Sequence, residues 1–102
     1  MSRTGKNHYL IIYRPPRASF AEDATPKETA VIERHFEYLK NKLADGSLIM
    51  AGRTENRSFG IAVIQADSEG MAREIMANDP AVKEGVFTGE LLPFRLALGG
   101  GE

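Results

Sequence analysis

Residues 25–39 read TPKETAVIERHFEYL, and this stretch predicts the first long helix of the chain. Thr25 can serve as its N-cap, Pro26 suits the first helical position, and Glu28 lies where a capping box requires it. Asp45-Gly46 supplies the predicted C-terminal stop. Apolar residues recur at helical spacing and predict the buried face: Ile32, Phe36, Leu39 and Leu43.

His35 is a polar residue at the border of this predicted apolar stripe. Successive helical residues turn by about 100°, which puts His35 roughly 60–80° from the centre of the stripe. A histidine there can border the core and still face a cleft. One interpretation is a half-buried imidazole that is hydrogen-bonded to a backbone carbonyl. The other is a general acid or base, because histidine changes its charge near neutral pH.

Apolar segments around this helix predict four strands and a second helix, capped by Asp67 or Ser68. The strands are expected at residues 9–13, 48–52, 59–64 and within 86–98. The element order is therefore β-α-β-β-α-β, the ferredoxin-like arrangement of the α+β class. In this fold, two helices cover one face of a four-stranded antiparallel sheet.

The predicted strands are apolar on both faces, as Ile11 between Leu10 and Ile12 illustrates. Helices would cover only one of these faces, and a bare apolar face of this size should be covered. We therefore expect a homodimer that packs sheet against sheet. Pro93 predicts an edge position or a bulge for the last strand, because proline donates no ladder hydrogen bond.

Length and composition indicate a cytoplasmic protein. The 102 residues suit one domain over residues 1–98, and the glycine-rich residues 99–102 are expected to form a disordered tail. A net charge of -1 gives no basic footprint for nucleic acid. No apolar run approaches a membrane span or a signal peptide. The absence of cysteine excludes disulfides and thiolate chemistry.

Four short motifs resemble the YCII-related family, a group of small dimeric proteins within the dimeric α+β barrels. They lie at residues 34–39, 46–52, 78–87 and 92–94. The resemblance implies a His–Asp pair at His35 and Asp79. It also implies chemistry on substituted aromatic rings, since a few relatives act on these, including removal of chloride from a chlorinated hydroquinone. The family commonly has a small residue or proline where this chain has Arg53, which would charge or crowd the cleft.

Asp79 also has a structural interpretation. The segment Asp-Pro-Ala-Val-Lys-Glu-Gly, residues 79–85, is a good start for a short helix, with Asp79 as N-cap, Pro80 first and Gly85 as the stop. A capping carboxylate has two oxygens to share, so capping and pairing with His35 are compatible only in part.

Arg14 and Arg53 are candidates for binding an anionic substrate, because arginine can hold a carboxylate through two parallel hydrogen bonds. Phe59 and Phe87 are candidate walls of an aromatic pocket. Solvated surface charge and ordinary core packing are the alternatives for these two pairs. No residue spacing suggests a metal site, and the strand at residues 59–64 lacks the stacking aromatics of an RNA-binding sheet.

The sequence thus predicts a small-molecule enzyme in which His35, oriented by Asp79, moves a proton on a cyclic or aromatic acid. Lyase, isomerase or dehydrochlorinase-like chemistry fits, and none of these requires a cofactor. The alternative is a non-catalytic dimer that binds a small ligand or serves as an accessory protein, with an apolar cleft lined by Phe59, Phe87 and Met50.

Overall fold

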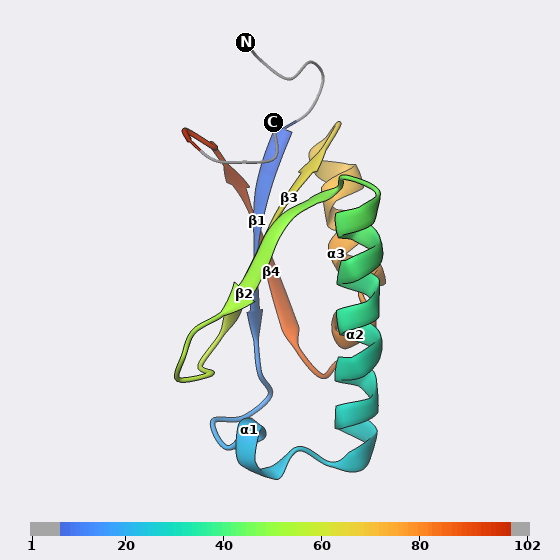
Figure 1. Ribbon diagram of the computed structural model, residues 1–102, viewed down its shortest axis with the longest axis vertical. Helices are drawn as coiled ribbons and strands as arrows, with labels where there is room; N and C mark the ends of the chain where they lie inside the picture. Colours follow the sequence, from blue (N-terminus) through green and yellow to red (C-terminus); the bar gives the residue numbers. More distant parts are fainter. Residues whose placement is uncertain (1–6, 99–102) are drawn as a thin grey trace.

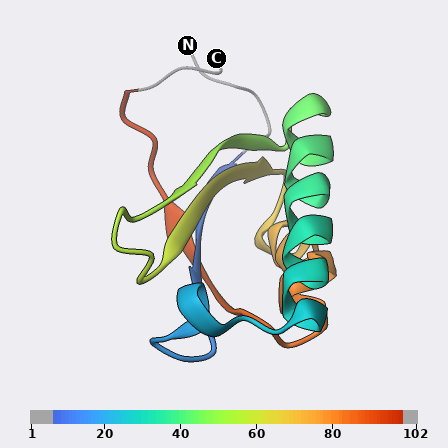
Figure 2. The ribbon, with the colours of Figure 1, turned by 60° about the horizontal axis from the view of Figure 1, so that its bottom comes forward.

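The computed structural model describes residues 7–98, whose four strands form an antiparallel sheet in the order β2-β3-β1-β4. The helices lie on one face of this sheet, and within the described residues the opposite face carries none (Figure 1, Figure 2). The ferredoxin-like α+β fold predicted from the sequence is confirmed. Its elements are β1 (Asn7–Arg14), α1 (Phe20–Asp23), α2 (Pro26–Ala44), β2 (Leu48–Arg53), β3 (Gly60–Ala66), α3 (Glu69–Asn78), α4 (Pro80–Lys83) and β4 (Thr88–Phe94).

The start of α2 follows its local sequence. Thr25 accepts from the backbone N–H of Glu28 at 3.1 Å, and the Glu28 carboxylate accepts from the backbone N–H of Thr25 at 2.9 Å. The helix ends at Ala44, and Gly46 follows its C-cap with a φ of 89°, a backbone conformation that glycine adopts without a steric penalty.

The predicted buried face of α2 is correct at Leu39 but displaced by a fraction of a turn at Phe36 and Leu43. Phe36 and Leu43 are 60% and 56% exposed. The row that faces the sheet is instead Val31, His35 and Leu39, spaced four residues apart along the helix. His35 therefore lies within the buried face, between two core residues, and not at its border.

The connection between β1 and α2 spans residues 15–25. A short helix, α1, forms there because Arg17 binds both neighbouring segments. Its guanidinium donates to Asp23 at 2.8 Å and to Glu28 at 2.8 and 3.0 Å. The Glu28 pKa is lowered to about 2, chiefly by this hydrogen bond from Arg17. These contacts hold α1 against the end of the sheet where the β2–β3 hairpin turns (Figure 2).

The two faces of β1 separate the core from the open side of the sheet. Tyr9, Ile11 and Tyr13 are buried beneath the helices, whereas Leu10 and Ile12 are only half-buried on the other face. β4 is an edge strand, as Pro93 predicts. Within residues 7–98, no helix is both long and apolar enough to cross a membrane. The tail expected at residues 99–102 lies outside the described residues.

Candidate active site

Asp79 lies at the corner where α3 ends and α4 begins. Its backbone is extended, as expected for a residue before proline, and its side chain caps α4 by accepting the Ala81 N–H at 2.9 Å. The side chain is 0% exposed, which makes Asp79 the one charged residue with a fully buried side chain among residues 7–98. A carboxylate at this depth requires partners for both oxygens.

His35 provides the second contact of this carboxylate. Its Nδ1 lies 2.8 Å from Oδ1 and 2.9 Å from Oδ2 of Asp79. Capping and pairing therefore coexist, because the imidazole approaches between the two oxygens while the backbone N–H uses a remaining lone pair of Oδ1. The sequence indicated that the two roles would compete, and the geometry accommodates both.

Tyr13 completes the shell around Asp79 from the end of β1. Its hydroxyl donates to Oδ2 at 2.9 Å, and its ring packs edge-on against the imidazole of His35 with centroids 5.1 Å apart. Burial, then the charge of Asp79 and this hydrogen bond, raise the Tyr13 pKa far above its usual value. From the sequence, Tyr13 is either a wall of an aromatic pocket or ordinary core, and nothing connects it with Asp79. Its only signal in the sequence is an aromatic residue at the penultimate position of β1.

These contacts determine the tautomer of His35. The Ala81 N–H and the Tyr13 hydroxyl both donate to Asp79, so its oxygens act as acceptors. Nδ1 of His35 must then carry the hydrogen of that bond, and in the neutral imidazole the lone pair lies on Nε2. Within the described residues, Nε2 has no hydrogen-bond partner, and the His35 ring lines a cavity.

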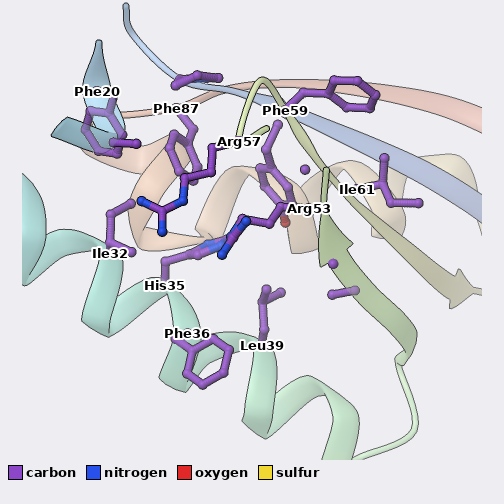
Figure 3. Close-up of a pocket in the computed structure, with 16 residues that line it drawn as sticks. Phe20, Ile32, His35, Phe36, Leu39, Arg53, Arg57, Phe59, Ile61 and Phe87 are labelled. Carbon is purple, nitrogen blue, oxygen red and sulfur yellow. The ribbon is translucent and has the colours of Figure 1, made fainter. Parts of the chain in front are cut away.

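The cavity has a volume of about 390 Å³ and lies between α1, α2 and the β2–β3 hairpin. Its aromatic lining comprises Tyr13, Phe20, Phe36, Phe59 and Phe87. Phe87 packs edge-on against His35 with centroids 5.5 Å apart. Figure 3 shows His35 projecting from α2 into this space. A cavity of this size with apolar walls suits one small ring.

Two arginines of the hairpin line the same cavity, namely Arg53 at the end of β2 and Arg57 in the turn. In Figure 3 both extend into the space that His35 faces. Arg57 was not among the sequence candidates, because nothing in the turn shows which side chain bends inward. Arg14 was a candidate, but it is absent from the cavity lining and pairs with Glu90 at 3.4 Å on the surface.

The apolar candidates are divided between the cavity and other surfaces. Phe87 lies beside His35. Phe59 reaches the rim, but it is 37% exposed and its ring points away from His35 (Figure 3). Met50 pairs with Val63 of β3 and is 52% exposed outside the cavity lining, so the cleft is not lined by Met50. No three His, Asp or Glu side chains of residues 7–98 converge as possible metal ligands.

Comparison with known families identifies the family of this chain. A family model of the YCII-related domain matches residues 8–95. The chain belongs to the YCII-related family. A comparison with curated protein sequences finds no match.

Solved structures share the fold of this YCII-related chain at low sequence identity. One is 5-chloro-2-hydroxyhydroquinone dehydrochlorinase from Burkholderia phenoliruptrix, solved with 2,5-dihydroxybenzoquinone; it has a TM-score of 0.57 and 19% identity over 85% of this chain and 93% of that one. Another, from Bacteroides thetaiotaomicron, is proposed to be an antibiotic biosynthesis monooxygenase, with a TM-score of 0.55 and 12% identity over 93% and 92% of the two chains. At these identities the likeness is one of fold.

Proposed function

We propose that this YCII-related protein is a small-molecule enzyme that uses His35 and Asp79 for acid–base chemistry on a cyclic or aromatic acid. The observation that carries the proposal is the position of one imidazole. Its Nδ1 meets a carboxylate that is 0% exposed, and the same ring lines an aromatic cavity of about 390 Å³. A base that is oriented on one side and open to a cavity on the other is the arrangement that proton transfer requires.

In the proposed reaction, Nε2 of neutral His35 takes a proton from a C–H or O–H group of the bound ring. Asp79 stabilises the imidazolium that forms, and the electron pair left on the substrate is delocalised onto a ring oxygen. In a lyase, that pair then expels a leaving group from the adjacent carbon. In an isomerase, His35 returns the proton to a different atom. The dehydrochlorinase that shares this fold supports the lyase route.

Turnover of a panel of hydroxylated and carboxylated ring compounds tests this proposal. His35→Ala and Asp79→Asn should each lower turnover by about 100-fold or more, the usual contribution of a positioned acid or base. The matched control is His8→Ala, because His8 lies on β1 outside the cavity lining. Circular dichroism should show that both site variants remain folded. Unchanged turnover in both would contradict the proposal.

We also propose that the protein is a homodimer that packs through the open face of the sheet. Apolar side chains gather on this face, including Leu10, Ile12 and Ile61, with Leu92 38% and Phe94 39% exposed. Burying them against a second copy would remove the exposed apolar patch. Sedimentation velocity should give a dimer that Leu10→Asp dissociates; a monomeric wild type at micromolar concentration would contradict this.

A further inference from the structure

Arg57 is held in a conformation that few arginines adopt. Its φ of 62° is the left-handed region, and it is the one non-glycine residue in residues 7–98 with a positive φ. The turn is fixed on both sides of it. Asn56 Oδ1 accepts from the Thr54 and Ser58 hydroxyls at 2.7 Å each, and the Arg57 N–H donates to the Thr54 carbonyl at 3.0 Å. Strain of this kind concentrates at functional sites.

Among residues 7–98, the hairpin arginines have no ion-pair partner. Arg14, Arg17, Arg34 and Arg73 each pair with a carboxylate. By contrast, Arg53 and Arg57 form no ion pair with any acidic side chain of residues 7–98. No Asp or Glu of that range lines the cavity either, so no carboxylate in its wall pairs with the two guanidinium groups.

We propose that Arg53 and Arg57 form an anion clamp, and that Arg57 determines specificity for a ring carrying a carboxylate. Guanidinium groups match a carboxylate through parallel N–H···O bonds, and apolar walls strengthen the attraction. The Arg53 guanidinium is steadied by a hydrogen bond from Nη1 to the Thr54 carbonyl at 3.2 Å, whereas the Arg57 guanidinium has no protein partner in the described chain. The clamp places the carboxylate at the hairpin and the ring between Phe20, Phe87 and His35.

This inference rests on the proposed function only for the location of the site, and binding tests it without turnover. The probes are 2-hydroxybenzoate and 2-hydroxybenzamide, which have nearly the same shape and differ in charge at neutral pH. Calorimetry should show 2-hydroxybenzoate binding to the wild type at least about tenfold more tightly. Arg57→Gln and Arg53→Gln should each reduce that preference by about tenfold or abolish it. Both variants should leave the affinity for 2-hydroxybenzamide unchanged.

Two further variants separate this clamp from other sources of positive charge. Arg14→Gln is the matched control, because this arginine lies outside the cavity lining, and it should bind as the wild type does. His35→Ala should keep the preference for the anion even though the proposed reaction fails. Equal binding of the two probes by the wild type, or an undiminished preference in Arg57→Gln, would overturn the inference. Loss of the preference in His35→Ala would likewise overturn it, by assigning the anion contact to the imidazole.

Discussion

Asp79 and Arg57 are both charged residues at turns. Asp79 contacts the His35 imidazole, and Arg57 lines the cavity that this ring faces. Asp79 is 0% exposed and accepts hydrogen bonds from Tyr13, His35 and Ala81. Arg57 is exposed, has a strained backbone, and forms no ion pair in the described chain. The acid–base geometry is therefore part of the folded core, whereas the proposed recognition of charge lies on a surface turn that the core does not need.

The difference arises from what each charge loses on folding. A buried carboxylate loses its hydrogen bonds to water, and protein donors must replace them. Three separate elements therefore converge on Asp79. An exposed guanidinium keeps its water until a ligand displaces it. Stability and binding should therefore respond to these two residues in opposite ways.

The largest effect is expected for Asp79→Ala. Its removal leaves the Tyr13 hydroxyl and the Ala81 N–H without their acceptor in the interior, and we expect a loss of about 3–5 kcal/mol in the free energy of unfolding. Urea denaturation measures it. The control Glu90→Ala removes an exposed carboxylate paired with Arg14 and should lose less than about 1 kcal/mol. Similar losses in the free energy of unfolding for the two variants would contradict the stabilising role assigned to the buried carboxylate.

Tyr13→Phe should have an intermediate effect. It removes one hydrogen bond to a charged group, which is worth about 2 kcal/mol, and leaves the ring packing intact. In the folded protein the Tyr13 pKa is raised from its ordinary value of 10.0, so the neutral hydroxyl stabilises the fold below that pH and the contribution is lost as the pH rises above it.

The free energy of unfolding should therefore decline less steeply with rising alkaline pH for Tyr13→Phe than for the wild type. The decline should not vanish, because Tyr38 remains and its pKa is raised to about 12, first by burial. Parallel alkaline curves for the two proteins would show that Tyr13 ionises as it does in the unfolded chain.

The smallest effect on stability, with the opposite sign, is expected for Arg57→Gly. Glycine adopts a φ of 62° without the steric penalty, so we expect a gain of up to about 1 kcal/mol in the free energy of unfolding. The same variant should lose the preference for 2-hydroxybenzoate. A substitution that stabilises the fold and weakens binding would mark the turn as a recognition element. A clear loss of stability would instead show that the arginine supports the hairpin.

The sequence predicted those parts of the fold that depend on neighbouring residues. Thr25 and Glu28 form the capping box because both partners lie within one turn of helix. Pro80 makes Asp79 a cap for the same local reason. The pairing of His35 with Asp79 joins residues 44 positions apart, and only the family resemblance suggested it.

The errors arose where the answer depends on the position of the sheet. Helical spacing combines Leu39 with Ile32, Phe36 and Leu43 as well as it combines Leu39 with Val31 and His35. Only packing against the strands decides which of these rows is buried. Arg57 escaped notice because the direction of a turn side chain depends on the hairpin register and on a left-handed backbone.

Because Asp79 caps α4, a related protein that has lost the proposed reaction would still need this carboxylate in order to fold. Retention of Asp79 in a related chain is therefore weak evidence that the chain is an enzyme. Residue 57 has no such structural role, so under the proposed clamp a single substitution there would alter the preferred ligand without unfolding the protein. We expect the hairpin turn to be the place where relatives of this protein have exchanged one substrate for another.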